Sequence, residues 1–384
     1  MTSGTATVGF LSTYPPTRCG LATFTSALAE HMGGAAAGVG VVQVVDHEQP
    51  VPAPEVVAQL VNGDRASGRA AAQALDGFDV VVVQHEYGIF GGPDGRDVLA
   101  LVDSLRVPVV VVLHTVLVNP TRSQREILLR LMARAAHLVT MTRTARDRLL
   151  EHYDADPDHV SVVQHGAADH RDLGPVVRAG LPAGRRPTVL TWGLLGPGKG
   201  IEWAVDAMAD LRDLNPRYLV LGRTHPKVLE HSGDGYRQDL LARVRARGVA
   251  DLVEFDDSYL DVDSLARVVA AADVVLLPYD SREQVTSGVL IEAVAAGRPV
   301  VSTAFPHAVE LLGDGTGLLV PRQDPPALAA ALRTVLSDTA AAREMAARAE
   351  AKAPELVWPA VAARYREITG AVARHGVVAM VAAS

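Results

Sequence analysis

The chain has 384 residues, of which 48% are hydrophobic and 21% charged. This is a globular composition, and the length favours two domains over one. The formal net charge is -8 and the pI is about 5.9. Because no block of the sequence is rich in Lys and Arg, this balance argues against nucleic acid as a partner. The single cysteine, Cys19, excludes an internal disulfide and a multi-cysteine metal centre.

The amino terminus has neither the basic stretch nor the long apolar stretch of a secretory signal. The longest apolar runs, such as residues 80–83 and 109–113, have the size of strands, whereas a membrane span needs about 20 apolar residues. We therefore expect a soluble, cytoplasmic protein, a monomer or homodimer, whose contact with membranes is at most peripheral.

In the first half of the chain, short apolar runs alternate with amphipathic stretches. Buried, β-branched strands separated by helices indicate a parallel sheet covered on both faces. Strands are expected at 7–11, 39–45, 79–83, 109–113, 138–141 and 160–163, and helices at 21–32, 123–136 and 143–152. A stretch rich in Gly, Pro and Arg, residues 166–186, then predicts a linker between domains.

The second half repeats the alternation. Strands are expected at 188–190, 218–221, 252–255, 273–277, 299–302 and 317–320, and helices at 201–211, 236–247, 264–271, 288–296, 326–337 and 358–373. The whole pattern predicts an α/β fold of two doubly wound, Rossmann-like, parallel-sheet domains that face each other across a cleft. The domains are residues 1–180 and 181–357, and residues 358–384 form a closing helix. Ligands of such sheets bind outside the carboxyl ends of the strands.

The segment richest in chemistry runs from Pro278 to Val301, as strand, polar loop, helix and strand. A helix that starts at Ser287-Gly288-Val289-Leu290 leaves its first N–H groups unpaired, and these groups together with the helix dipole hold a phosphate. Gly288 permits close approach of the backbone. Glu292, about one turn further on, is placed to accept hydrogen bonds from ribose hydroxyls. The alternative is a surface loop before a packing helix, with Glu292 in solvent.

A second glycine-rich loop, Trp192-Gly-Leu-Leu-Gly-Pro-Gly-Lys-Gly, follows the first strand of the second domain. A flexible ammonium such as that of Lys199 suits a spread phosphate charge, and Gly193 lets the backbone approach it. The alternative is that Lys199 only closes a turn.

Three more segments of the first domain follow predicted strands. Arg18-Cys19-Gly20 opens a helix after the first strand, and His114 ends the strand at 109–113. His85-Glu86 opens a glycine-rich loop after the strand at 79–83. A strand-end histidine is alternatively a structural, hydrogen-bonded residue.

In this order, the segments resemble glycosyltransferase family 4, whose members have the GT-B fold and act with retention. The resemblance also implies that the helix of residues 358–384 crosses back to the first domain. The family carries a Glu-x7-Glu pair around a Gly-Leu/Val-Leu turn; here Glu292 fills the second position and Gln284 the first. Its Gly-Arg-Leu-x3-Lys-Gly loop is matched at Gly193 and Lys199, but Leu194 stands in the arginine position. Arg223, after the next strand, is a candidate for the missing guanidinium.

The resemblance implies a hexosyltransferase that moves mannose or glucose from a nucleoside-diphosphate sugar to a hydroxyl of a carbohydrate or other small acceptor. GDP-mannose is the first donor to expect and UDP-glucose the second; this donor is a substrate, and neither a cofactor nor a metal is expected. The resemblance assigns catalytic roles to His114, Lys199 and Glu292, donor contacts also to Gly20, Gly193, Arg223, Gln284, Ser287, Gly288, Val289 and Leu290, and the acceptor side to Arg18, His85 and Glu86.

Two other functions stay open on the sequence. One is a GT-B glycoside phosphorylase, which needs a pocket for free phosphate. The other is a non-catalytic partner subunit that binds a nucleotide sugar, which the Leu194 and Gln284 departures favour. A basic helix at 121–136 is also either a membrane-docking face, as in lipid-acceptor members of the family, or an ordinary solvated surface.

Overall fold

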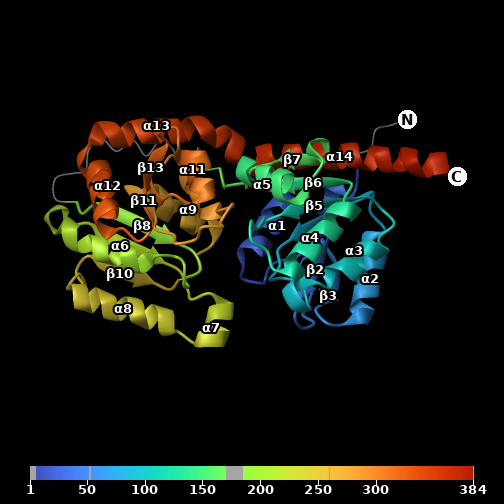
Figure 1. The fold of residues 1–384 in the computed structure, drawn as a ribbon, viewed down its shortest axis with the longest axis horizontal. Coiled ribbons are helices and arrows are strands. Elements are labelled where there is room, and N and C mark those ends of the chain that lie inside the picture. Colours follow the sequence, from blue (N-terminus) through green and yellow to red (C-terminus); the bar gives the residue numbers. More distant parts are fainter. Residues whose placement is uncertain (1–5, 52, 170–184, 259, 384) are drawn as a thin grey trace. The chain divides into compact units, whose positions relative to one another are not determined.

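The computed structural model describes residues 6–51, 53–169, 185–258 and 260–383 (Figure 1). The chain forms two compact units: unit 1 comprises Met1–Gly166 and Trp358–Ser384, and unit 2 comprises Ala167–Val357. Each unit is built on one parallel sheet with helices on both faces, which confirms the predicted α/β fold class. The predicted boundary between residues 180 and 181 lies outside the described residues.

Unit 1 contains a seven-stranded sheet of order β3-β2-β1-β4-β5-β6-β7. Its strands are β1 (Val8–Ser12), β2 (Val39–Val45), β3 (Val56–Val61), β4 (Val80–His85), β5 (Val109–Leu113), β6 (His137–Thr140) and β7 (Val160–Val162). Val8 pairs with Val39 on one side and Val80 on the other, in parallel register. The carboxyl ends of the central strands therefore lie together at one sheet edge. Every residue of β4 and β5 is buried, as expected for strands covered on both faces.

The helices of unit 1 are α1 (Gly20–His31), α2 (Arg65–Leu75), α3 (Val98–Ser104), α4 (Arg122–Arg134), α5 (Arg143–Tyr153) and α14 (Trp358–Ala383), with short 3-10 turns at Ala35–Ala37, Pro93–Gly95 and Pro157–His159. Helices α1 and α14 pack together over the sheet. Trp358 and Tyr365 of α14 join Phe24 and Leu28 of α1 in one apolar core. The carboxyl-terminal helix is thus part of unit 1, although the chain reaches it only after passing through unit 2.

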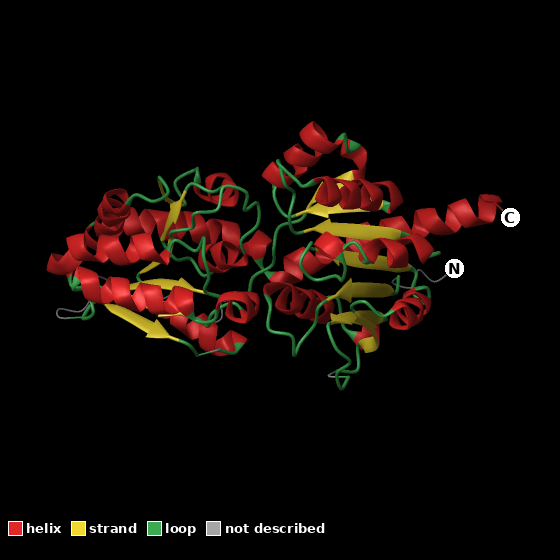
Figure 2. Cartoon of the chain, turned by 60° about the horizontal axis from the view of Figure 1, so that its bottom comes forward, coloured by secondary structure: helices red, strands yellow, loops and turns green. Residues whose placement is uncertain are grey.

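Unit 2 contains a six-stranded parallel sheet of order β10-β9-β8-β11-β12-β13. Figure 2 shows strands in yellow with helices in red on either side of them. Its strands are β8 (Thr188–Trp192), β9 (Arg217–Leu221), β10 (Val253–Asp256), β11 (Val274–Leu277), β12 (Val300–Thr303) and β13 (Gly317–Val320). Its helices are α6 (Ile201–Met208), α7 (Pro226–Ser232), α8 (Gly235–Arg247), α9 (Val262–Ala271), α10 (Gly288–Ala295), α11 (Pro306–Leu312), α12 (Pro325–Ser337) and α13 (Thr339–Leu356), with a 3-10 stretch at Ala209–Leu214. One core joins α6, α8 and α12 to the sheet, and a second joins α9, α10 and α11.

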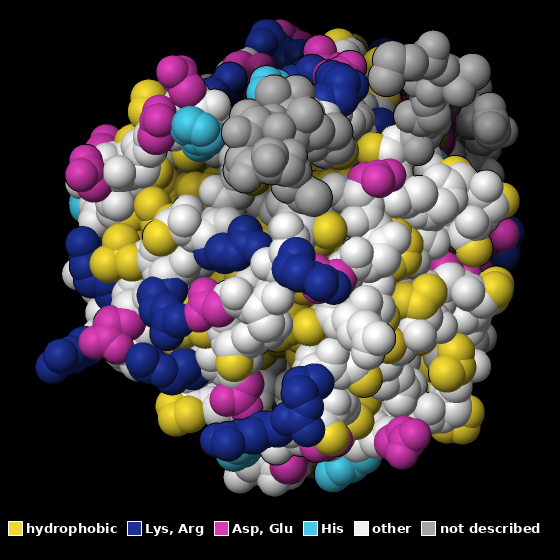
Figure 3. Space-filling model, turned by 90° about the vertical axis from the view of Figure 1, so that its right-hand side faces the viewer, with side chains coloured by type: hydrophobic (Ala, Val, Ile, Leu, Met, Phe, Trp, Pro, Cys, Tyr) yellow, Lys and Arg dark blue, Asp and Glu magenta, His cyan; other side chains and the backbone are white. Residues whose placement is uncertain are grey.

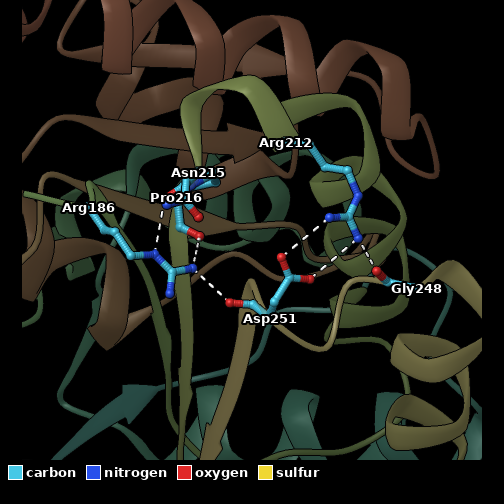
Figure 4. Close-up of polar contacts among 6 residues, drawn as sticks. All are labelled: Arg186, Arg212, Asn215, Pro216, Gly248 and Asp251. Atoms are coloured by element: carbon cyan, nitrogen blue, oxygen red, sulfur yellow. Dashed lines mark hydrogen bonds and ion pairs between the residues drawn. The ribbon is translucent and has the colours of Figure 1, made fainter. Parts of the chain in front are cut away.

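The residues that lead into β8 are fixed to the loops in front of β9 and β10 (Figure 4). The Arg186 guanidinium donates to the carbonyls of Asn215, Pro216 and Asp251 at 3.2, 2.9 and 2.8 Å. Arg212 in turn bonds the Asp251 carboxylate and the Gly248 carbonyl. These contacts close the edge of the sheet where strands begin, so the opposite edge is left for ligands.

The basic helix α4 is tied into unit 1. Its arginines each have a protein partner: Arg122 pairs with Glu126, Arg130 with Asp103, Arg134 donates to Leu105 and Val107 carbonyls, and Arg125 to that of His152. Figure 3 shows basic and acidic side chains interspersed on one face of the molecule. The paired arginines favour the solvated-surface interpretation over membrane docking. None of the helices in the described part of the chain combines the length and hydropathy that a membrane span requires.

Candidate functional site

The amino terminus of α10 is capped by Ser287. Ser287 has extended backbone angles, and its hydroxyl accepts from the Leu290 N–H at 3.3 Å. The predicted helix start at Ser287-Gly288 is thereby confirmed. The Ile291 N–H is taken by the Ser287 carbonyl. The N–H groups of Gly288 and Val289, in the first turn, have no acceptor within the helix and are left for a ligand.

Lys199 lies beside the strand that leads to this helix. Its ammonium is 4.4 Å from the centroid of the Tyr279 ring, a cation–π contact. The ring is 1% exposed and stacks on Phe305. The Asp280 N–H donates to the Gly198 carbonyl at 2.9 Å. The loop of residues 192–200, which we call the Lys199 loop, is therefore held against the end of β11, and Lys199 is half-buried.

The Lys199 loop also contacts α10 and the next loop of unit 2. A side-chain carbon on Gly193 would lie 3.7 Å from Val289 Cγ2, and one on Gly222 would lie 2.0 Å from the Gly193 carbonyl oxygen. Gly222 has a positive φ of 143°, so only glycine fits this approach. Unit 2 thus brings Gly193, the α10 terminus and the segment around Lys199 together at the carboxyl edge of its sheet.

The other predicted donor residues of unit 2 lie around this edge with different degrees of exposure. Glu292 is half-buried in the second turn of α10. Gln284 Nε2 donates to the Thr286 carbonyl at 3.0 Å, inside the loop before the helix. Arg223 is exposed, and its Nε donates to the Asp257 carbonyl at 2.8 Å. Leu194 is half-buried in the Lys199 loop.

In unit 1, Gly20 is the first residue of α1, as predicted. A side-chain carbon there would meet nothing within 4 Å. Among the described residues, no contact therefore requires glycine at this position. Cys19 caps the helix, its sulfur accepting from the Ala22 N–H at 3.4 Å. The preceding Arg18 is exposed.

Two histidines lie at the carboxyl edge of the unit 1 sheet. His114 Nε2 is 2.7 Å from Gln84 Oε1, and its ring meets the Phe24 ring edge-on. Burial, followed by repulsion from His165 and His85, lowers the pKa of His114 to about 3. It is therefore neutral at neutral pH. A neutral imidazole with its Nε2 turned to Gln84 presents Nδ1 for another contact.

His85 is fully buried, and within the described residues neither of its ring nitrogens has a hydrogen-bond partner. Burial lowers its pKa to about 4. The adjacent Glu86 is half-buried and accepts from the Tyr87 N–H at 2.9 Å and from the Thr115 hydroxyl at 2.5 Å. Of the three predicted acceptor-side residues, Arg18 is exposed, Glu86 is half-buried and His85 is buried.

The sequence did not predict two residues that contact this site, His307 and Tyr279. His307, 2% exposed, accepts the Ser287 N–H at Nδ1. Tyr279 carries the Lys199 ammonium on its ring. The Phe305-Pro306-His307 run gave no signal, because its side chains become informative only when β11 and β12 lie next to each other.

The fold defines a class of protein: a chain of two α/β units, each built on one parallel sheet. Comparison with known families gives the same class. The sequence-family model described as Glycosyltransferase Family 4 matches residues 20–171. The family model described as Glycosyl transferases group 1 matches residues 186–338. The chain belongs to these GT-B glycosyltransferases of the family 4 type, and so to a family of enzymes.

Curated relatives carry the name D-inositol 3-phosphate glycosyltransferase. That of Kineococcus radiotolerans is 33% identical over 256 residues, 61% of this chain and 57% of the relative. That of Salinispora arenicola is 32% identical over 260 residues, 64% and 57% of the two chains. The matched region thus spans somewhat more than half the length of these relatives.

Solved structures share the fold over nearly the whole chain. A glycosyltransferase from Rickettsia africae superposes with a TM-score of 0.75 at 14% identity, covering 96% of this chain and 98% of that one. Anabaena HepE, solved with UDP and glucose, gives 0.73 at 16% identity, covering 94% and 99%. At these identities the likeness establishes the GT-B fold.

Proposed function

We propose that this chain is a retaining hexosyltransferase that moves a hexose from a nucleoside-diphosphate sugar onto an acceptor hydroxyl. One observation carries the proposal: the Lys199 loop and the start of α10 lie at one sheet edge of unit 2, where a side-chain carbon on Gly193 would be 3.7 Å from Val289 Cγ2. A cation beside a helix amino terminus neutralises a diphosphate, which is the leaving group of this reaction. Membership of a glycosyltransferase family supports the same activity.

In the proposed reaction, the bond between the sugar's anomeric carbon and the diphosphate oxygen breaks, and the acceptor oxygen bonds to that carbon on the same face. The acceptor's proton passes to the departing phosphate, so no pair of protein carboxylates is needed at hydrolase spacing. Lys199 and the first amides of α10 stabilise the charge that develops on the diphosphate. Glu292 binds the ribose, His114 contacts the sugar, and Glu86 and Arg18 serve the acceptor.

Different observations limit the choice of candidate donors and candidate acceptors. The sequence resemblance favours GDP-mannose, and HepE, solved with UDP and glucose, adds a UDP-hexose as the second donor to test. The curated relatives are named for D-inositol 3-phosphate, so a phosphorylated polyol belongs among the acceptors to test beside simple sugars.

The first test is a thermal-shift panel of UDP, GDP, ADP and their hexose conjugates, because a ligand that binds only the native state raises its stability. We expect one nucleotide to raise the melting temperature. Indifference to all of them would remove the proposal.

The second test is turnover. We expect donor hydrolysis and transfer in the wild type and their loss in Glu292→Ala, with the fold retained. A phosphorylase would instead require inorganic phosphate, and a non-catalytic subunit would bind the nucleotide without turnover in either form.

A further inference from the structure

Three residues at alternate positions, Thr303, Phe305 and His307, form the connection from β12 into α11. We call this connection the support segment. Their side chains are 0%, 0% and 2% exposed, so none of them is placed to touch a ligand directly. Thr303 and Phe305 nevertheless contact Tyr279, over whose ring the Lys199 ammonium lies, and His307 contacts Ser287 at the start of α10.

The first two residues of the support segment hold Tyr279. The Thr303 hydroxyl donates to the Tyr279 carbonyl at 2.6 Å. The Phe305 ring stacks on the Tyr279 ring, with centroids 5.3 Å apart and planes inclined by 28°. Because the Lys199 ammonium lies over that same ring, the support segment fixes the surface on which the cation rests.

The third residue holds the start of α10. The Ser287 N–H donates to His307 Nδ1 at 2.9 Å. A backbone amide can only donate, so Nδ1 presents its lone pair and the ring proton is on Nε2. Ser287 is itself 4% exposed and caps α10 through its hydroxyl. His307 therefore fixes the residue from which the free helix amides begin.

We propose that His307 is a positioning residue of the donor site: it sets the start of α10 relative to Lys199, so that both meet one diphosphate. This inference rests on the proposed function. It differs from a purely structural role because it requires the acceptor atom at Nδ1, and filling the same volume does not suffice.

The test uses the full chain and four forms of it: wild type, His307→Phe, His307→Asn and Leu312→Ala. Phe keeps the ring volume without an acceptor, whereas Asn keeps an oxygen near the place of Nδ1. Leu312 is buried in the same helix but packs on Gly317, so its variant loses stability without touching Ser287. Binding of UDP, GDP and ADP is measured by calorimetry, and folding by circular dichroism; His307→Leu replaces His307→Phe if the latter does not fold.

We expect the dissociation constant of the bound nucleotide to rise about tenfold in His307→Phe and to stay within about threefold of wild type in His307→Asn. Leu312→Ala should melt earlier yet bind within about twofold of wild type. Unchanged affinity in His307→Phe, or equal losses in the Phe and Asn variants, would overturn the positioning role alone. A wild type that binds none of the three nucleotides would overturn the proposed function, and the positioning role with it.

Discussion

A side-chain carbon on Gly200 would lie 1.8 Å from the carbonyl oxygen of Pro278. Gly200 also has a positive φ of 65° and forms the cap of α6. The last residue of the Lys199 loop is therefore pressed against the residue that follows β11. This contact fixes the distance between the loop and the strand end that carries Tyr279.

We predict that Gly200→Ala will destabilise unit 2 by about 3 kcal/mol, from overpacking added to backbone strain. Gly198→Ala is the matched control, because Gly198 also has a positive φ, 87°, but nothing lies within 4 Å of the added carbon. It should cost only about 1–2 kcal/mol. Urea unfolding of both variants gives the comparison, and equal losses would show that the contact with Pro278 relaxes freely.

Removal of the Lys199 charge should weaken diphosphate binding. In Lys199→Met we expect the dissociation constant of the nucleoside diphosphate to rise about tenfold or more, and the difference from wild type to shrink as salt is added. Lys352→Met is the control, since Lys352 is bound to the Leu311 carbonyl and Asp314. It should lower the melting temperature and leave the affinity unchanged. A wild-type affinity in Lys199→Met would exclude Lys199 from the donor site.

Replacement of Gln284 by the family's glutamate should not improve donor binding in this chain. An ionised carboxylate cannot donate to the Thr286 carbonyl as the amide does, so the loop before α10 loses a hydrogen bond and gains repulsion. We expect Gln284→Glu to raise the donor KM about fivefold to tenfold. Glu283→Gln, one residue away, is the control for a change of charge in the same loop. Tighter donor binding in Gln284→Glu would contradict this account.

The buried histidine of β4 should make unit 1 less stable in acid. Between about pH 6.5 and the folded-state pKa of about 4, the unfolded chain binds a proton at His85 that the folded chain does not. The free energy of unfolding should therefore fall as the pH drops through this range, by about 1.4 kcal/mol per pH unit from this residue.

His85→Phe should remove that share of the slope, and should keep or raise stability at neutral pH because two unpartnered ring nitrogens disappear. Trp358 fluorescence follows unit 1 when Trp192 and Trp203 of unit 2 are replaced by Phe. The exposed His152 is the control position, where His152→Gln should leave the slope as it is. Because burial also lowers the pKa of His114, to about 3, part of the slope should remain in His85→Phe. A slope as steep as that of the wild type would show that His85 does not contribute to it.

The strands buried on both faces were predictable from the sequence, because a fully apolar run has few other places in a domain. The expected strand 109–113 is β5 itself, and the helix after Ser287 begins where its cap and glycine indicated. Strand β3 lies at the sheet edge and was missed although its sequence, VVAQLV, is mostly apolar. Gln59 interrupts the run, and the apolar residues around it do not alternate with polar ones as in a half-buried strand. Helix α13 was missed because its Ala-rich sequence carries few large apolar residues at helical spacing, and because Pro354 within it normally ends a helix.

The candidate site was predictable only in part, because some of its residues follow strands directly and others depend on contacts that are remote in sequence. Gly193, Lys199 and Ser287 follow strands directly, so the parallel sheet brings them to one edge. His307 and Tyr279 act through neighbours that are remote in sequence, and no local pattern signals such a contact. The full burial of His85 likewise depends on how the sheet of unit 1 is covered, which the residues around it do not encode.

The chain enters and leaves unit 2 at adjoining points, since the Ala167 N–H donates to the Leu356 carbonyl at 2.8 Å and Ala167 bridges to Val357. Because the two ends of residues 167–357 already meet, we expect that this segment can be produced as a separate protein. We also expect that it can be exchanged for the equivalent segment of a relative with few changes at the junction. If the donor binds to unit 2 as proposed, such an exchange would transfer the donor preference of the relative to this chain.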